Sequence, residues 1–349
     1  MNAVAGQSKR IRVAVVGTGE FGRNHARVYR ELEGAELVGV FDQNQERGAA
    51  VAAEFQTQVL KSLDELRRAD AVSVAVPTVA HADVGCRLLE MGLDVLVEKP
   101  MAVSLVEADA LLHAAKKNGR ILQVGHVERF NPAVIAVEPI LNRPLFFEVH
   151  RLGVFTPRSL DVDVIYDLMI HDLDILLALV DEPVVEVKAV GIPVLTDKVD
   201  IAHARLEFTG GAVANITASR VSTERVRKMR FFQQHEYISL DYARRDALRI
   251  GVKKPGPHPE FAFEKLNAPA VEPLHAELEA FVDAARSRKE PRTNGAAGRA
   301  ALELAVRVMA SIQEHAARVN LLGGRQSAGA MGGCKAAGLD VFATHDKTR

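Results

Sequence analysis

The chain has 349 residues, 48% hydrophobic and 26% charged, which is typical of a soluble globular protein with room for two domains. Its 44 Lys and Arg balance 45 Asp and Glu, so net charge gives no support for a nucleic-acid or membrane-surface partner. The two cysteines, Cys86 and Cys334, lie in contexts too different to suggest a disulfide, and the N-terminus lacks the apolar run of a secretory signal. We therefore expect a cytoplasmic protein.

The first expected elements form a dinucleotide-binding pattern. A short apolar strand at 11–16 leads directly into GTGEFG, in which Gly17, Gly19 and Gly22 have the spacing G-x-G-x-x-G, and then into a helical pattern. The first glycine permits a tight turn, the second lets the backbone approach a pyrophosphate, and the third lets helix and strand pack closely. The phosphates then meet the free N–H groups of the helix N-terminus. Because a strand and a helix flank the run, we favour a dinucleotide site over an incidental turn.

A second strand, at 36–41, ends at Asp42. An acid at this distance from the glycine run is placed to bond the ribose hydroxyls of NAD. Asp42 would repel the 2′-phosphate of NADP, and Gln43 and Asn44 offer no arginine to receive it. Arg47 is expected a full turn into the next helix. The sequence therefore predicts NAD, with NADP less favoured.

Strands and helices continue to alternate up to residue 125, which predicts a doubly wound parallel sheet of the Rossmann type. The further strands are expected at 71–77, 94–100 and 121–125. Ligands of such sheets bind at the carboxyl ends of the strands. The groups expected there are the glycine loop, Pro77 and Thr78 with His81, and Glu98 with Lys99. Lys99 closes an apolar strand just before a proline that holds it extended, although taken alone it could be an ordinary surface lysine.

The stretch 164–180, VIYDLMIHDLDILLALV, predicts a mostly buried helix with polar residues in unusual places. Asp167, His171 and Asp174 are spaced i, i+4 and i+7, so they would form one polar stripe on an apolar helix. Burying them costs free energy unless they pair or serve a site. Either His171 is a core histidine held by Asp167, or the stripe is functional. Asp172 would point about 100° away from His171, so we expect no metal site.

The second half of the chain is rich in consecutive strands with short links, starting at 145–151. This predicts an antiparallel or mixed sheet with one face covered by the 164–180 helix. The other face needs a partner surface, so a homo-oligomer, a dimer or tetramer, is expected. The predicted organisation is a dinucleotide-binding domain at 10–125, a substrate and oligomerisation domain at 126–322, and a disordered tail at 323–349. A basic cluster could face an anionic ligand, but more often such a run is a solvated strand face or subunit rim: Arg220, Arg225, Arg227, Lys228 and Arg230.

Together these motifs resemble the glucose–fructose oxidoreductase/inositol dehydrogenase/rhizopine (Gfo/Idh/MocA) family, from residue 11 to about residue 321. The motifs that carry the resemblance are GTGEFG at 17–22, Pro77-Thr78-x-x-His81, Glu98-Lys99-Pro100 and Asp167-x-x-x-His171-Asp172. The resemblance implies an N-terminal Rossmann domain and a C-terminal α/β domain whose open, largely antiparallel sheet serves oligomerisation. It also implies that Lys99 and His171 are catalytic and that Asp167 supports them. The expected cofactor contacts are Gly17, Gly19, Glu20, Phe21, Gly22, Asp42, Pro77, Thr78, His81, Glu98 and Lys99.

The implied reaction is oxidation of a secondary alcohol, with hydride passing to the nicotinamide. His171, held near neutral pKa by Asp167, would take the hydroxyl proton. Lys99 would hydrogen-bond the same oxygen and stabilise the developing negative charge. We therefore expect Lys99 and His171 to meet in one cleft, although they lie in different domains. Arg129 and Asn131 are candidate substrate contacts, and the alternative for Asn131 is that it caps the following helix.

Within the family, VGHVERFNPAV at 124–134 together with the 164–180 stretch is more similar to the nucleotide-sugar members than to the inositol members. This implies a UDP-linked N-acetylhexosamine, UDP-N-acetylglucosamine, oxidised at carbon 3 to a 3-keto sugar for amination in lipid A synthesis. Arg129, Arg151 and Arg158 could bind its diphosphate. One alternative is a dehydrogenase of free polyols or monosaccharides. Another is a non-catalytic dinucleotide-binding regulator, which would need the glycine loop but not both Lys99 and His171.

Overall fold

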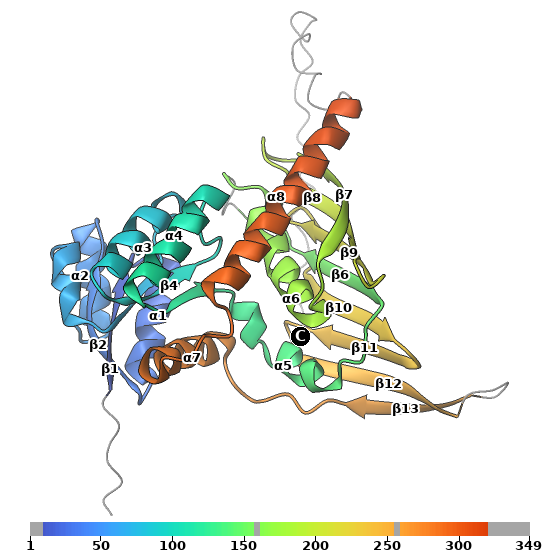
Figure 1. Ribbon diagram of the computed structural model, residues 1–349, viewed down its shortest axis with the longest axis horizontal. Coiled ribbons are helices and arrows are strands. Elements are labelled where there is room, and N and C mark those ends of the chain that lie inside the picture. Colours follow the sequence, from blue (N-terminus) through green and yellow to red (C-terminus); the bar gives the residue numbers. More distant parts are fainter. Residues whose placement is uncertain (1–9, 157–160, 255–258, 320–349) are drawn as a thin grey trace, which may run out of the picture.

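The computed structural model describes residues 10–156, 161–254 and 259–319. Figure 1 shows a smaller sheet with its helices beside a larger sheet, and the long helix α8 running between the two. This α/β architecture confirms the fold class expected from the sequence. The predicted tail at 323–349 lies outside the described residues. Within the described ranges, no helix is long and apolar enough to cross a membrane.

The first sheet has five parallel strands in the order β2-β1-β3-β4-β5. Its strands are β1 (Ile11–Val16), β2 (Ala35–Phe41), β3 (Ala71–Val74), β4 (Asp94–Glu98) and β5 (Leu122–Gly125). The helices that follow them are α1 (Glu20–Glu31), α2 (Gln45–Glu54), α3 (His81–Glu90) and α4 (Leu105–Asn118), with short helices η1 (Leu63–Arg68) and η2 (Thr78–Ala80). The strands are apolar and mostly buried because helices cover both faces, as doubly wound sheets require.

The second sheet has eight strands in the order β13-β12-β11-β10-β6-β9-β8-β7. The strands are β6 (Phe146–Leu152), β7 (Val184–Ile192), β8 (Ile201–Phe208), β9 (Val213–Ser219), β10 (Val226–Gln233), β11 (Glu236–Asp241), β12 (Asp246–Lys254) and β13 (Glu260–Lys265). Neighbours are antiparallel except β6 and β9, which are parallel. The expected largely antiparallel sheet is therefore confirmed.

One face of the second sheet is covered by helices and holds the largest core. Phe147 and Phe231 of the sheet pack there against Leu173 and Leu176 of the covering helix. The predicted single helix at 164–180 is, however, two elements. A π turn, η5 (Ile165–Met169), precedes the α-helix α6 (Ile170–Val180). Single π turns inside helices are rare and occur frequently at functional sites.

Short helices connect the two sheets along the chain: η3 (Val127–Phe130), α5 (Pro132–Val137) and η4 (Glu138–Ile140). Two longer helices follow the second sheet. Helix α7 (Pro273–Ser287) returns to the first sheet, where Leu278 and Phe281 join the core beneath α1. Helix α8 (Gly295–Arg318) contacts α4, α6 and β7 and places Leu302 in the core of the first sheet and Val308 in that of the second. The two sheets therefore share a helix, which fixes them relative to each other.

The close packing of α8 on β5 gives a stability prediction. Replacing an interior helical glycine by alanine ordinarily stabilises a protein by about 0.5–1 kcal/mol. At Gly298 an added Cβ would lie 2.4 Å from Cγ2 of the buried Val124, so Gly298→Ala should instead destabilise by about 1–3 kcal/mol. At Gly48 in α2 the nearest atom would be 3.5 Å away, so Gly48→Ala should stabilise. Denaturation by urea or heat measures both changes, and a stabilised Gly298→Ala variant would contradict this packing.

Candidate active site

The glycine run forms a tight turn between β1 and α1. Gly17 has φ +87°, and a Cβ there would lie 2.5 Å from the carbonyl oxygen of Ala75. A Cβ at Gly22 would lie 1.7 Å from the carbonyl oxygen of Gly17, so only glycine permits this approach. Gly19, the N-cap of α1, has open space where a Cβ would be. The turn therefore offers bare backbone at a helix N-terminus, which fits a dinucleotide pyrophosphate.

Glu20 and Phe21 are the first residues of α1, and Phe21 is 57% exposed at this edge of the sheet. Thr78 begins η2 shortly after β3, and Pro77 is its N-cap residue. All four therefore lie at the carboxyl edge of the parallel sheet, where the sequence expectation placed them.

Asp42 lies at the end of β2 and is held by several donors. The Thr18 N–H and hydroxyl donate to Asp42 Oδ2 at 2.6 and 2.7 Å. Burial would raise the pKa of Asp42, but the hydrogen bonds from Arg47 and Thr18 outweigh it and lower the pKa to about 2. Arg47, expected a full turn into the next helix, is instead the third residue of α2, and its side chain reaches Asp42. Its Nε and Nη2 donate to Oδ2 and Oδ1 at 3.0 and 2.8 Å.

His81 does not present its ring to the carboxyl edge of the sheet. It is buried, with Nδ1 2.9 Å from the carbonyl oxygen of Pro100 and Nε2 2.9 Å from that of Val76. Because the ring is buried and both its nitrogens face backbone carbonyl oxygens, the expected cofactor contact by this side chain is not supported. His81 instead ties the segment after β3 to the residue that follows Lys99.

Glu98 also points inward. Its Oε1 lies 2.9 Å from Nε2 of His25, a fully buried residue of α1. Burial would raise the pKa of Glu98, but the close contact with His25 and the positive charge of Lys99 lower it. Sequence reasoning did not single out His25. Beyond this pair lies Glu277 of α7, fully buried, whose pKa is raised well above its usual range by burial and by the negative charge of Glu98.

Lys99 reaches from the end of β4 to the π turn of the second half of the chain. Its Nζ donates to the carbonyl oxygen of Asp167 at 2.6 Å and to Asp167 Oδ1 at 3.3 Å. The Lys99 side chain is 11% exposed and that of Asp167 is 30% exposed. The contact joins residues 68 positions apart and brings an ammonium and a carboxylate together at the junction of the two sheets.

His171 lies one residue into α6, directly after the π turn. The expectation that Asp167 holds its pKa near neutral is wrong, because the Asp167 carboxylate pairs with Lys99 instead. Burial, then the positive charges of Lys99 and Arg151, lower the pKa of His171 well below 6.5. His171 is therefore a neutral imidazole at pH 7, and its Nδ1 has no hydrogen-bond partner among the described residues. Neutral imidazole is the form that accepts a proton.

Arg151, expected as a possible phosphate ligand, is buried in a structural network. Its Nε and Nη2 donate to the two carboxylate oxygens of Asp172 at 2.7 and 2.8 Å, and Nη1 donates to Glu128 at 2.9 Å. The guanidinium also lies 4.9 Å from the ring centre of Tyr242. Breaking a buried pair of this kind costs about 3–5 kcal/mol. Arg151 therefore anchors α6 to β6 and is not free to bind substrate.

Asn131 and Arg129 likewise make internal contacts. Asn131 Oδ1 accepts a hydrogen bond from Ala133 N at 3.1 Å, so Asn131 is the N-cap of α5, the alternative left open by the sequence. Arg129 Nη1 lies 3.4 Å from Asp174 Oδ1. The structure gives no support to a free substrate contact by Asn131 or Arg129, and Arg158 lies outside the described residues.

The residues of the basic cluster differ in whether they form ion pairs in the structure. Arg220, Lys228 and Arg230 pair with acids, whereas the Arg227 guanidinium has no hydrogen bond or ion pair with any described residue. Arg227 lies opposite Arg151 in the β6–β10 register, so both point to the face covered by α6. It is exposed, and its charge lowers the pKa of His171 after larger effects from burial and other cations. The sequence named Arg227 only as one member of a basic cluster, because the direction of its side chain depends on strand register.

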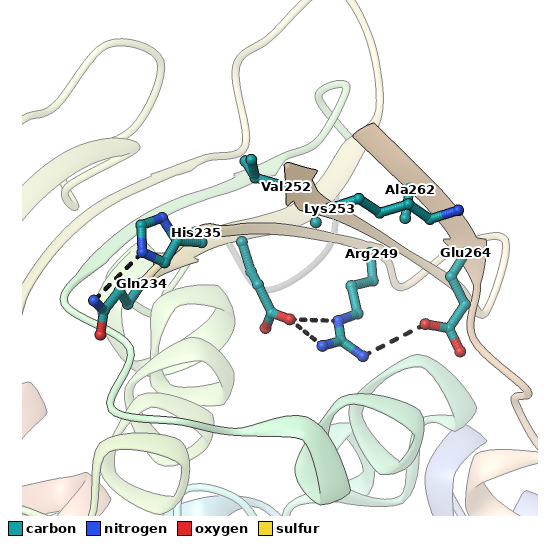
Figure 2. A pocket seen from close by; sticks show the side chains of 9 residues that line it. Gln234, His235, Arg249, Val252, Lys253, Ala262 and Glu264 are labelled. Carbon is teal, nitrogen blue, oxygen red and sulfur yellow. Dashed lines mark hydrogen bonds and ion pairs between the residues drawn. The ribbon is translucent and has the colours of Figure 1, made fainter. Parts of the chain in front are cut away.

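A hollow of about 280 Å³ lies elsewhere, over β11 to β13, and Figure 2 shows Arg249 linked there to Glu264. Arg249 also pairs with Glu236, and Gln234 contacts His235 at 3.4 Å. Neither Lys99 nor His171 lines this hollow, so it is separate from the candidate active site. Among the described residues no group of three or more His, Cys, Asp or Glu could hold a metal ion.

Two family models match the chain. One, described as an oxidoreductase family with an NAD-binding Rossmann fold, matches residues 11–126. The other, described as the GFO/IDH/MocA C-terminal domain, matches residues 147–236.

Individual proteins are similar over most of the chain. UDP-N-acetylglucosamine 3-dehydrogenase from Acidithiobacillus ferrooxidans is 39% identical over 308 residues, covering 87% of this chain and 97% of that protein. A solved structure of that enzyme has a TM-score of 0.82 at 37% identity, over 88% of this chain and 99% of the other. The NAD(+)-dependent scyllo-inositol 2-dehydrogenase of Bacillus subtilis is 30% identical over 61% of this chain and 68% of its own length. A levoglucosan dehydrogenase structure, solved with NADH and levoglucosan, shares the fold at 19% identity with a TM-score of 0.78 and covers 88% of this chain and 98% of the other.

Proposed function

The chain belongs to the GFO/IDH/MocA oxidoreductase family, and we propose that it oxidises carbon 3 of UDP-N-acetylglucosamine with NAD. It is an oxidoreductase that acts on CH–OH groups and uses a nicotinamide dinucleotide. The product of the proposed reaction is the 3-keto sugar. The alternative of a non-catalytic regulator is disfavoured, because the similar proteins are named dehydrogenases.

The observation that carries the proposal is the contact of Lys99 with Asp167 beside His171. The bound dinucleotide supplies the hydride acceptor at the carboxyl edge of the first sheet. His171, neutral at pH 7, takes the proton of the sugar hydroxyl. Lys99 donates to the same oxygen and stabilises its developing negative charge. Asp167 holds Lys99 in place, so that each group acts from a fixed position.

The identity of the substrate rests on the relatives and on Arg227. The match to the UDP-N-acetylglucosamine enzyme spans almost all of both proteins, whereas the match to the scyllo-inositol enzyme is shorter. A diphosphate requires cationic donors. Arg227 is exposed, without an ion pair among the described residues, and faces α6. We assign it to the diphosphate in place of Arg129 and Arg151, whose guanidinium groups are already paired.

The substrate proposal is tested by incubating the protein with NAD and UDP-N-acetylglucosamine and measuring NADH and the 3-keto product, trapped as its amine. Lys99→Ala and His171→Ala should each lower kcat by about 100- to 10,000-fold with little loss of NAD binding. Because the pKa of His171 is lowered, the protonated, inactive form appears only below pH 6.5, so kcat/KM should stay level as pH falls through 6.5.

Arg227→Gln is the matched variant for the diphosphate in the same assay. It should raise KM for the UDP-sugar by about tenfold and change kcat little. Lys228→Gln is its control, because Lys228 points to the opposite face of β10 and lies 3.7 Å from Asp241. Turnover of inositol or glucose with none of the UDP-sugar would refute the substrate while leaving the family intact.

The preference for NAD is proposed from Asp42, which is ionised at all working pH values because its pKa is about 2. Its charge repels a 2′-phosphate, and Arg47 is occupied in pairing with it. Asp42→Ala should weaken use of NAD and, by freeing Arg47, improve use of NADP by about tenfold or more. The double variant Asp42→Ala/Arg47→Ala should lose that gain. Equal kcat/KM for NAD and NADP in the unaltered protein would show that Asp42 does not discriminate.

We also propose that the dinucleotide-binding domain ends near residue 125.

We further propose a homo-oligomer that forms through the uncovered face of the second sheet. The rings of Phe146 and Phe232 lie 5.8 Å apart on that face, and Tyr237 lies 5.2 Å from Phe232. Phe232 is 37% exposed, so an apolar aromatic group faces outward. Light scattering of the purified protein should give a dimer or tetramer mass, and a monomer at micromolar concentration would contradict this interface.

A further inference from the structure

Buried polar atoms without partners occur on His171 and on two residues of the same electrostatic group, His126 and Asp174. The Nδ1 of His171 is buried and has no hydrogen-bond partner among the described residues. The same holds for both ring nitrogens of His126, which is 1% exposed, and for Oδ2 of Asp174, which is 2% exposed. Leaving a buried polar group unpaired costs free energy. Internal water commonly bridges buried polar groups that have no partner in the protein itself.

The three residues come from two elements that contact each other. His126 links β5 to η3, and Asp174 lies one turn beyond His171 on α6, which packs on η3. Burial lowers the pKa of His126, and the negative charge of Asp174 opposes that effect. A positive charge on His126 would lower the pKa of His171. The charged groups that act on His126 are Asp174 on α6, Arg129 on η3, and Lys99 and Glu98 at the end of β4.

A hollow of about 410 Å³ lies next to this group, between α6 and the start of α8. Asp174 and Arg129 line it, together with small apolar side chains of both helices: Leu177, Ala178, Ala297 and Ala300. Asp174 therefore lines the hollow and has one carboxylate oxygen near Arg129, whereas its Oδ2 is buried and has no hydrogen-bond partner among the described residues. His126 interacts electrostatically with both Asp174 and His171, and the helix η3 that it precedes packs on α6.

We propose that His126 and Asp174, with water between them, pass the substrate proton from His171 to the hollow between α6 and α8. The inference rests on the proposed function, in which His171 is the base. Bound sugar and dinucleotide would cover the outer side of His171, so a proton taken there would otherwise stay until a product leaves. An inner path lets the proton leave while both products are bound.

The proposed relay from His171 to the solvent moves one proton and no electrons. The O–H bond of the sugar breaks as its proton binds Nε2 of His171, and the hydride that balances the oxidation goes to the dinucleotide. Nδ1–H of His171 then gives up its proton to the path, which returns the imidazole to its neutral form. One proton reaches the solvent for each hydride transferred.

A single-turnover experiment on the full chain tests the path. Protein, NAD and UDP-N-acetylglucosamine are mixed in weakly buffered solution, and NADH absorbance is followed together with a pH-indicator dye. In the unaltered protein, proton release should keep pace with NADH formation. In His126→Phe the first NADH should still form, because His171 can take one proton, but proton release should lag by about tenfold or more.

His315→Phe is the matched control, because His315 also has a buried Nδ1 without a partner among the described residues but lies near the far end of α8. In His315→Phe, proton release should still keep pace with NADH formation. If His126→Phe does not fold, Asp174→Asn provides the same test, since it keeps the shape of the side chain and removes its charge. Proton release that stays in step with NADH in the folded variant would overturn the path. If the unaltered protein makes no NADH from the UDP-sugar, the proposed function itself fails, which is a distinct result.

Discussion

Lys99 Nζ donates a hydrogen bond at 2.6 Å to the carbonyl oxygen of Asp167, across the junction of the two sheets. A side chain only 11% exposed keeps its ammonium there at a cost in desolvation, which the two oxygens of Asp167 offset. The contact requires the end of β4 and the π turn before α6 to stay together. Helix α8 provides that constraint, because it contacts both α4 and α6. The positive charge beside His171 then helps to keep the imidazole neutral.

Much of this arrangement was predictable, because it depends on local physics. The spacing of Gly17, Gly19 and Gly22 predicted the turn that the structure shows, since each added Cβ at the outer two would clash with backbone. Alternating strands and helices predicted the parallel sheet, whose carboxyl edge gathers the loops wherever they occur in sequence. The polar residues at Asp167 and His171 marked the helix that covers the second sheet. Placing such groups on an apolar helix costs free energy unless they pair or serve a site.

The rest depended on contacts between segments far apart in sequence. The stretch 164–180 contains no glycine or proline that would announce a π turn, and the turn directs Asp167 to Lys99 rather than to His171. The Arg47 side chain extends back from the first turn of α2 to Asp42. Arg227 faces α6 because of the register between β6 and β10. His25 lies on the buried face of α1, and a histidine at such a position could have been singled out from the helical pattern. Its partner Glu98 lies too far away in the sequence to be identified in this way. A cytoplasmic location stays a prediction.

In the proposed reaction, these groups remove hydrogen from carbon 3 of the sugar. The most direct test uses UDP-N-acetylglucosamine carrying deuterium at carbon 3, incubated with NAD and the full chain, with mass spectrometry of the reduced dinucleotide. We expect the deuterium to be transferred to the dinucleotide, and the reduced dinucleotide to form more slowly than with the unlabelled sugar. Reduced dinucleotide that contains no deuterium would contradict the proposed reaction, because hydride would then leave another carbon.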